Sequence, residues 1–506
     1  MWRQRVRAIL SGNTIDDASL RSLNLYDDDE ELRRVNSDDS ISNNTMRITY
    51  TRSNEVIPDS DSNSLAPTLP RGSVHNSVHT GFVDADIDKD NCVEKTKGAE
   101  SEEEDEDSGI PDGGWRAWLC VLGAFCGITS TFGISNGTGT IQDYLLTERL
   151  KGQSETKIGW IFSLWLFIMY AGSVQTGPIF DAYGPRVLLI PGCIGWTLSV
   201  FMLSLCKEFY QFILAFSILG GLSTSMIFNP SVAVLGQYFN RRRSLATGIS
   251  FLGGSAGGVF VPLMLEHLFP QIGYGWSIRV LGFIVLGLSI VTCICVQGRT
   301  TREDVDWREA LPDIKSLRHL DFAACTAGVF LVEWGFFVPV IYLVGYARSQ
   351  GLSSGYSNAI IAYMNIASSF GRVIPGWLAD RYGCYNVVII SCLLTGIFCC
   401  AVWIPAGTTK AGLTVFVVLF GLGSGSTISA TPNCVANISP LSDYGKRYGT
   451  AYSLASIAVL TGAPIAGALT DNNYLGLQLF AGCSFILAGI AFIIARLIAA
   501  GRKLQF

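Results

Sequence analysis

Two ionisable side chains stand far from the ends of long apolar stretches: Glu333 in GVFLVEWGFF and Arg372 in SSFGRVIPGW. A charge at the middle of a lipid bilayer is costly unless it is paired or in contact with water. A guanidinium can bind a carboxylate through two parallel hydrogen bonds, so Arg372 is a candidate anchor for an organic anion. Glu333 is a candidate proton carrier. If the two instead form a structural ion pair, the carboxylate stays charged and Glu333 would be a poor proton carrier.

Other polar and aromatic side chains within apolar stretches could complete a substrate site. Asparagine amides could orient a substrate by hydrogen bonding, and aromatic rings could form the apolar wall of a cavity. Asn229-Pro230 and Pro432-Asn433 also stand where a proline would distort a helix and free carbonyl groups. A helix-packing role is the alternative for each member of this set: Asn136, Asn229, Asn365, Asn433, Phe337, Tyr342 and Tyr452.

A third kind of residue recurs at a fixed spacing. The segments GPIFDAYGPR and GWLADRYGCY share the pattern G-x3-D-x2-G, and their aspartates lie 199 residues apart. A carboxylate at a helix end can hold two parts of a protein together through cationic partners and through the positive end of a helix dipole. We expect a gate here, with a simple helix cap as the alternative. The residues of the two copies are Gly177, Asp181, Gly184 and Arg186, and Gly376, Asp380, Arg381 and Gly383.

Long apolar stretches are the elements that must position these residues. Apolar residues make up 49% of the 506-residue chain and charged residues only 15%, well below the roughly 25% of a soluble protein. Runs of about 18–25 apolar residues are long enough to cross a bilayer as helices. We therefore predict an all-α integral membrane protein with twelve transmembrane helices, at 115–137, 156–180, 186–206, 209–237, 243–266, 276–297, 321–346, 356–379, 385–405, 411–435, 447–469 and 476–500.

These stretches divide the chain into five predicted parts. Residues 1–110 carry 12 Lys and Arg but 24 Asp and Glu. We expect this acidic cytoplasmic tail to be disordered, because it cannot bury enough apolar surface to offset the entropy of ordering. The repeated motif predicts two six-helix pseudo-repeats, as in many secondary transporters. The parts are the tail at 1–110, six-helix bundles at 111–298 and 321–500, a cytoplasmic linker loop at 299–320 and a short cytoplasmic tail at 501–506.

The charge of the loops predicts the orientation. The loops on the side of the termini carry twelve Lys and Arg, and those on the other side carry six. Because positively charged loops tend to stay in the cytoplasm, both termini and both motif copies are expected there. The cell membrane is the expected location, with the vacuolar membrane as the alternative.

Two further segments carry a family resemblance over about residues 111–500. PDGGWRAW precedes the first span, and YFNRRRSLATGISFLGG enters the fifth. On these segments and the repeated motif the chain resembles the major facilitator superfamily and, within it, fungal members of the monocarboxylate porter family. Lactate-carrying members have Lys where Asn136 aligns and Asp where Ser368 stands, so the resemblance does not imply lactate. The signature residues are Asp112, Gly113, Gly114, Trp115, Tyr238, Phe239, Arg242, Arg243 and Gly248.

The resemblance implies a secondary active transporter that moves a small organic anion, monocarboxylate-like, or a related metabolite by alternating access, often with H+. Efflux of a fungal secondary metabolite is the alternative, and a non-transporting membrane sensor on the same fold is a further one. No enzyme is expected, because the body lacks a nucleophile elbow, a phosphate-binding loop and a His/Cys cluster. The expected partners are a small-molecule substrate and the lipid bilayer; no cofactor, metal or nucleic acid is expected.

Overall fold

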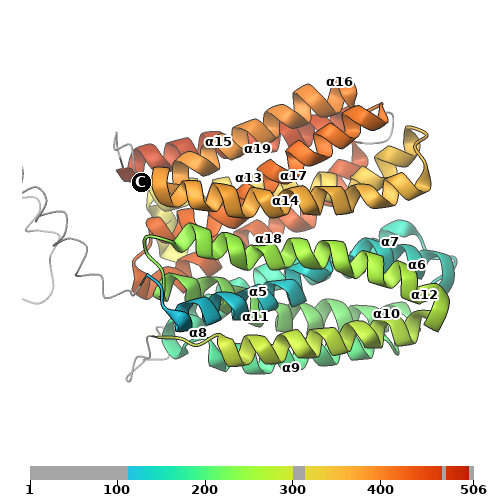
Figure 1. The fold of residues 1–506 in the computed structure, drawn as a ribbon, viewed down its shortest axis with the longest axis horizontal. Coiled ribbons are helices and arrows are strands. Elements are labelled where there is room, and N and C mark those ends of the chain that lie inside the picture. Colours follow the sequence, from blue (N-terminus) through green and yellow to red (C-terminus); the bar gives the residue numbers. More distant parts are fainter. Residues whose placement is uncertain (1–111, 300–313, 470–473, 501–506) are drawn as a thin grey trace, which may run out of the picture. The chain divides into compact units, whose positions relative to one another are not determined.

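The computed structural model describes residues 112–299, 314–469 and 474–500, and every regular element within them is helical (Figure 1). The predicted disordered tail, most of the predicted linker and the short C-terminal tail lie outside the described residues. Below, residues 112–299 are called the first half and residues 314–500 the second half.

The first half contains helices joined by short turns or by kinks. A proline or a π-helical stretch interrupts several of them, as at Ile213–Gly220 between α10 and α11. The helices are α5 (Trp115–Ser135), α6 (Thr138–Tyr144), α7 (Glu155–Ala171), α8 (Ser173–Tyr183), α9 (Arg186–Leu203), α10 (Phe209–Phe212), α11 (Gly221–Ala233) and α12 (Arg243–Cys295).

The second half repeats this pattern, with a π-helical stretch at Cys399–Trp403 between α15 and α16. They are α13 (Leu320–Ser349), α14 (Ser354–Tyr382), α15 (Cys384–Phe398), α16 (Ile404–Ala406), α17 (Lys410–Asn437), α18 (Tyr444–Ala468) and α19 (Leu475–Ala500).

The predicted spans all correspond to helical segments. Within the described residues, ten helical stretches are long and apolar enough to cross a membrane. One of these, α12, has 53 residues, but Gly273 has a φ of 70° and a ψ of 170° and separates the predicted spans 243–266 and 276–297. The 29-residue α14 is long enough but more polar, and it contains the predicted span 356–379. The all-α membrane fold predicted from the sequence is confirmed.

Large apolar side chains cover the outer faces of these helices. Ile194 and Ile294, for example, are 65% and 64% exposed. Contiguous apolar surface of this kind is unusual in a soluble monomer, whereas in a bilayer it contacts lipid tails.

The two halves pack against each other along several pairs of helices. In Figure 1 the blue-to-green helices of the first half lie on one side of the bundle and the yellow-to-red helices of the second half on the other. Across the boundary, α12 packs against α14, and α18 packs against α8 and α7. Each copy of the repeated motif stands at the end of one of these boundary helices, α8 or α14.

Candidate functional site

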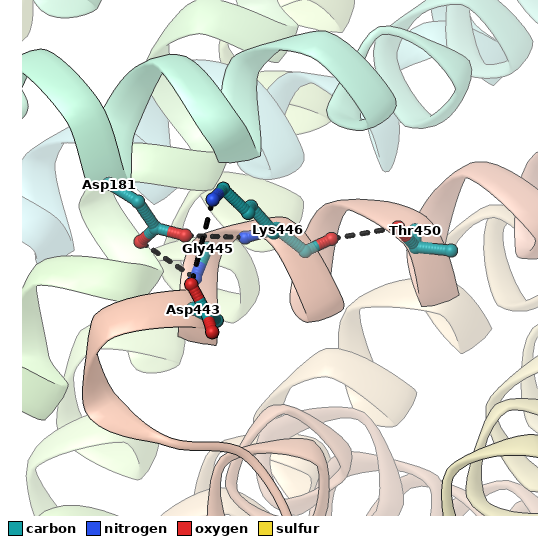
Figure 2. A network of polar contacts seen from close by, with 5 residues as sticks. All are labelled: Asp181, Asp443, Gly445, Lys446 and Thr450. Atoms are coloured by element: carbon teal, nitrogen blue, oxygen red, sulfur yellow. Dashed lines mark hydrogen bonds and ion pairs between the residues drawn. The ribbon is translucent and has the colours of Figure 1, made fainter. Parts of the chain in front are cut away.

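Asp181, in the first copy of the repeated motif, caps a helix of the other half. Its carboxylate accepts hydrogen bonds from the backbone N–H groups of Gly445 (2.9 Å) and Lys446 (2.7 Å) in the first turn of α18 (Figure 2). The first N–H groups of a helix have no partner within it and form the positive end of its dipole. Asp181 therefore supplies acceptors that α18 lacks. We call this contact the α8–α18 latch.

The second copy of the motif makes the same kind of contact, here from the second half to a helix of the first half. The Asp380 carboxylate, near the end of α14, accepts hydrogen bonds from the backbone N–H groups of Ser244 (2.8 Å) and Leu245 (3.0 Å) in the first turn of α12. We call this contact the α14–α12 latch. Each half thus caps one helix of the other. The two aspartates do cap helices, but because those helices belong to the opposite half, the contacts could also serve as a gate.

Glycines allow the helices in each latch to approach closely. A Cβ atom at Gly177 would collide with the Gly445 carbonyl oxygen, and one at Gly376 would lie 2.8 Å from the Ser244 carbonyl oxygen. Gly248 lies one turn farther along α12 than the α14–α12 latch and packs against the Arg372 carbonyl oxygen of α14. Gly449 lies one turn farther along α18 than the α8–α18 latch and packs against the backbone of α8. The glycines of the motif therefore act through backbone packing between the halves.

The last glycine of each motif copy ends its helix. Gly184 follows α8 with a φ of 79°, and Gly383 follows α14 with a φ of 90°. These are left-handed conformations that a residue with a Cβ atom rarely adopts.

Side-chain cations and the positive end of a helix dipole are the partners expected for the two aspartates. The hydrogen bonds come from backbone N–H groups at the start of a helix, and not from cationic side chains. Arg186 is exposed at the first residue of α9. Arg381 is also exposed and lies over the Trp377 ring, with its guanidinium carbon 4.1 Å from the ring centroid. In the α8–α18 latch, the Lys446 ammonium pairs with Asp443 at 3.6 Å.

The two signature segments contact each other beside the α14–α12 latch. The Asp112 carboxylate accepts hydrogen bonds from the backbone N–H groups of Asn240 (2.6 Å) and Arg241 (2.8 Å). Gly114, with a φ of 92°, is the N-cap residue of α5. The turn formed by Asp112, Gly113 and Gly114 therefore holds the loop that leads into α12.

Aromatic residues of the same segments fasten this loop to neighbouring helices. The Tyr238 hydroxyl donates to the Gln297 carbonyl oxygen at 2.9 Å, and the Phe239 ring packs edge-on against Trp118 with centroids 5.4 Å apart. Trp115 is 71% exposed at the start of α5, as expected for a side chain at a membrane interface.

The three arginines of the fifth-span signature have different environments. Arg241 and Arg242 are exposed, and Arg242 is the N-cap residue of α12. Arg243 is more buried, and its guanidinium carbon lies 5.3 Å from the centroid of Tyr444 in the second half. Arg243 therefore adds a cation–π contact between the halves, next to both latches.

Arg372 is buried between the halves, and no carboxylate among the described residues pairs with it. The side chain is 1% exposed, its Nη1 group donates to the Phe251 carbonyl oxygen in α12, and its Nε group has no hydrogen-bond partner. Within the described part of the chain it forms no ion pair with Glu333. The ion pair between Glu333 and Arg372, which the sequence allows as an alternative, is therefore not formed in this structure.

Glu333 lies in a separate environment that is rich in tyrosine. It is 1% exposed in α13, and its carboxylate accepts a hydrogen bond from the Tyr170 hydroxyl in α7 at 3.4 Å. The Tyr170 ring packs against Tyr452 of α18, with centroids 5.7 Å apart, and the Tyr452 hydroxyl shares a hydrogen bond with Thr431 at 3.1 Å. The bond between Tyr170 and Glu333 crosses from the first half to the second.

Aromatic rings connect the environments of the two charged residues. Phe132 stacks on Phe228 and Phe336, with centroids 6.0 and 6.5 Å away, and Phe228 also packs against Tyr170 and Phe251. A Cβ atom at Gly254 would approach both the Phe132 ring and the Arg372 guanidinium. We call Phe132, Tyr170, Phe228, Phe251, Phe336 and Tyr452 the central aromatic cluster.

Asn136 and Asn365, two of the four predicted asparagines, lie near each other. Asn136 and Asn365 both face Gly258 of α12. Asn136 donates to the Gly254 carbonyl oxygen at 3.4 Å, which places it beside the glycine that also faces Arg372.

The other two asparagines make packing contacts close to the latches. Asn229 donates to the Thr176 hydroxyl, five residues before Asp181. Asn433 accepts from the Thr247 hydroxyl at 3.1 Å, three residues after Ser244.

The remaining predicted aromatic residues differ in position. Phe337 packs edge-on against Phe336 and so borders the central aromatic cluster. Tyr342 faces Gly467 of α18, farther along α13. Tyr452 belongs to the cluster itself.

Sequence reasoning missed several residues that the structure places at the centre. Phe132, Tyr170, Phe228 and Phe251 stand in apolar runs where an aromatic residue is unremarkable, so no local signal separates them from lipid-facing residues. Burial at the boundary between halves distinguishes them, and it depends on which helices pack together.

The comparisons with known proteins decide the family. The sequence profile of the Major Facilitator Superfamily matches residues 119–374 and 323–503. The chain belongs to the major facilitator superfamily. This is a family of multi-pass membrane transporters, not of enzymes.

Similar proteins with curated names are fungal transporters of this superfamily. The aspyridones efflux protein apdF of Emericella nidulans is 36% identical over 387 residues, which cover 75% of this chain and 78% of that protein. The riboflavin transporter MCH5 of Saccharomyces cerevisiae is 32% identical over 440 residues, which cover 81% and 84%.

A solved structure shows the same superfamily fold. The human organic anion transporter MFSD10 superposes with a TM-score of 0.57 over 75% of this chain and 98% of that one, at 15% sequence identity. At this level of identity the similarity concerns the fold alone.

Proposed function

We propose that this superfamily member is a secondary active transporter of the monocarboxylate porter type that carries an organic anion with an apolar, aromatic body. The observation that carries this proposal is Arg372, a buried guanidinium that has no carboxylate partner in the described part of the chain and whose Nε group is unbonded there. A buried cation without an anion is costly, so a bound anion would be strongly favoured at this position. A substrate carboxylate or enolate could accept from Nε and Nη together.

The central aromatic cluster supports an apolar body for the substrate. Phe132 lies beside the Arg372 guanidinium, and its ring stacks on two others. An aromatic or planar ligand could replace these ring contacts without exposing apolar surface to water. Asn136 and Asn365 would orient it by hydrogen bonding.

Proton coupling is the second part of the proposal. The Glu333 carboxylate has no cationic partner among the described residues and accepts only from a tyrosine hydroxyl. A carboxylate in such a place can take up and release a proton as the halves part, because its bond to Tyr170 joins them. Alternating access would follow from release of the two latches on the cytoplasmic face of the cell membrane.

Efflux of a secondary metabolite is a second candidate for the direction of transport. The named efflux protein apdF, 36% identical to this chain, favours it. The riboflavin transporter MCH5, at 32% identity, leaves other substrates and the opposite direction of transport as alternatives. A non-transporting sensor remains a third candidate.

Comparative metabolite profiling tests the proposal. Metabolites would be measured inside and outside cells that express or lack the protein, at two external pH values. We expect at least one organic acid to change its gradient, and Arg372→Ala to abolish that change while the protein remains in the membrane. Arg279→Ala removes a charge from α12 whose guanidinium lies over Trp276, a ring outside the central aromatic cluster, and is the matched control.

Each outcome bears on one part of the proposal. Unchanged transport by Arg372→Ala would contradict the anchor role. A gradient that ignores external pH in the unaltered protein would contradict proton coupling. If no metabolite moves in either direction, the sensor becomes the better interpretation.

A further inference from the structure

The end of the loop before α12 and the first turn of α12 carry the sequence Arg241-Arg242-Arg243-Ser244-Leu245. Protein kinases with acidic substrate grooves select a serine that has arginines two and three positions before it and an apolar residue after it. Arg241 and Arg242 are exposed and could enter such a groove, where carboxylates would bind their guanidinium groups. Ser244 is the residue in the acceptor position.

Ser244 is also a donor in the α14–α12 latch. Its backbone N–H group donates to Asp380 at 2.8 Å, and its side chain lies beside the same carboxylate. The residue is 6% exposed, and its carbonyl oxygen is close to Gly376 of α14. The closed latch therefore leaves no space for an added group on the hydroxyl, and the nearest charge is negative.

We propose that Ser244 is a phosphorylation site for a basic-residue-directed protein kinase, and that phosphate on this hydroxyl holds the α14–α12 latch open. In the reaction, the Ser244 oxygen attacks the γ-phosphorus of ATP. The new O–P bond forms as the bond to ADP breaks, and the hydroxyl proton passes to the base of the kinase. The phosphate adds about −1.5 to −2 charges beside Asp380, so the two anions repel each other.

The open latch provides a better place for the phosphate. Once Asp380 has left, the N–H groups of the first turn of α12 lack an acceptor, and the N-terminus of a helix attracts anions. The preceding arginines add positive charge. The modified serine therefore favours the separated state of α12 and α14, whereas the unmodified serine favours the closed one.

The other latch cannot be modified in the same way. Its residue at the position of Ser244 is Gly445, which has no hydroxyl group, and a Cβ atom there would lie 2.5 Å from Asp181. Phosphorylation would consequently act on one latch only. The proposal concerns Ser244 and Asp380 alone and does not depend on which substrate is carried.

The first experiment measures phosphate on Ser244 in the full chain reconstituted in lipid nanodiscs. The protein is incubated with ATP and the catalytic subunit of cyclic-AMP-dependent protein kinase, and phosphopeptides are quantified by mass spectrometry so that other serines are distinguished. Because the closed latch buries the hydroxyl, we expect slow modification of the unaltered chain. Asp380→Asn weakens the latch and should increase the initial rate by about tenfold.

Two variants control for recognition. Ser244→Ala should carry no phosphate on the corresponding peptide, and Arg242→Ala should lower the rate in the Asp380→Asn background because the kinase loses a basic contact. Absence of phosphate on Ser244 in Asp380→Asn would overturn the proposed site. Equal rates in Asp380→Asn and the unaltered chain would overturn its dependence on the latch.

The second experiment tests the effect on the latch. Hydrogen–deuterium exchange of the amides in residues 243–247 would be compared in Ser244→Asp and in the neutral variant Ser244→Asn. We expect about tenfold faster exchange in Ser244→Asp, and no difference between the two substitutions in an Asp380→Asn background. Equal exchange of the two single variants would show that negative charge at this position does not open the latch.

Discussion

The α8–α18 latch and the α14–α12 latch share their backbone geometry and differ in the side chains around it. In both, an aspartate accepts from two consecutive N–H groups at the start of a helix in the other half, and a glycine four residues earlier allows close approach. The first latch has an ion pair between Lys446 and Asp443 beside it, whereas the second has the Ser244 hydroxyl.

This difference distinguishes the interactions that hold the two halves together from those that modify the stability of the closed state. The aspartate, the backbone donors and the glycine contact are common to both latches, so they form the mechanical part. The ion pair and the hydroxyl group occur once each and can make the two latches respond to different conditions. Substitutions in the common part should therefore have larger effects than substitutions in the distinct part.

The largest effect is expected from a bulky side chain in the closer glycine contact. In Gly177→Val the new side chain would meet the Gly445 carbonyl oxygen, and backbone atoms cannot move away as a flexible side chain would. We expect the closed state to lose about 3 kcal/mol or more. Amide exchange measures the loss at residues 444–448 for Gly177→Val and at residues 243–247 for Gly376→Val, where the contact is looser and a smaller loss is expected. Equal losses would contradict the difference in packing.

Neutralising either aspartate should have the next largest effect. Asp181→Asn and Asp380→Asn each weaken two charge-assisted hydrogen bonds, and we expect about 1.5–3 kcal/mol in each case. Exchange of the amides in the capped first turn is the measurement, in α18 for Asp181→Asn and in α12 for Asp380→Asn. If the two latches open in one concerted step, each single variant should also speed exchange in the turn that the other aspartate caps. No change in that turn would show that the latches open independently.

A smaller effect is expected for the contact between the latches. In Arg243→Gln the cation–π contact with Tyr444 is lost while the backbone of α12 is unchanged, and we expect about 0.5–2 kcal/mol. Both latches should loosen by similar amounts, since the contact joins α12 to α18. Tyr444→Phe keeps the ring face and is the matched control. Faster exchange in only one of the two capped turns would show that Arg243 serves that latch alone.

The smallest effect is expected for the partly exposed ion pair of the α8–α18 latch. Lys446→Ala removes the ammonium group but keeps the backbone N–H that donates to Asp181, so we expect about 0.2–1 kcal/mol. The effect should shrink as salt is raised. Exchange at residues 444–448 in low and high salt tests this, with the α14–α12 latch as the internal reference. A loss as large as that of Asp181→Asn would mean that the ammonium group, rather than the backbone, holds the carboxylate.

Several features could be predicted from the sequence because their signals are local. The spans follow from the length and apolarity of continuous segments, and Arg372 and Glu333 are conspicuous as the charges within them. The spacing of Asp181 and Asp380 in two similar segments indicated paired positions. The hydrogen bonds to these aspartates come from backbone N–H groups and not from the expected cationic side chains, because backbone donors have no signature in the sequence.

The sequence by itself therefore determined the membrane fold, the positions of the charged residues within it and the repeat that relates its halves. These properties depend on composition and spacing along the chain. Only the tertiary structure decided that Asp181 meets Gly445 and Lys446, that Asp380 meets Ser244 and Leu245, and that Glu333 faces Tyr170 instead of Arg372. These contacts join residues more than a hundred positions apart, and they follow from which faces of which helices pack together at the boundary between the halves.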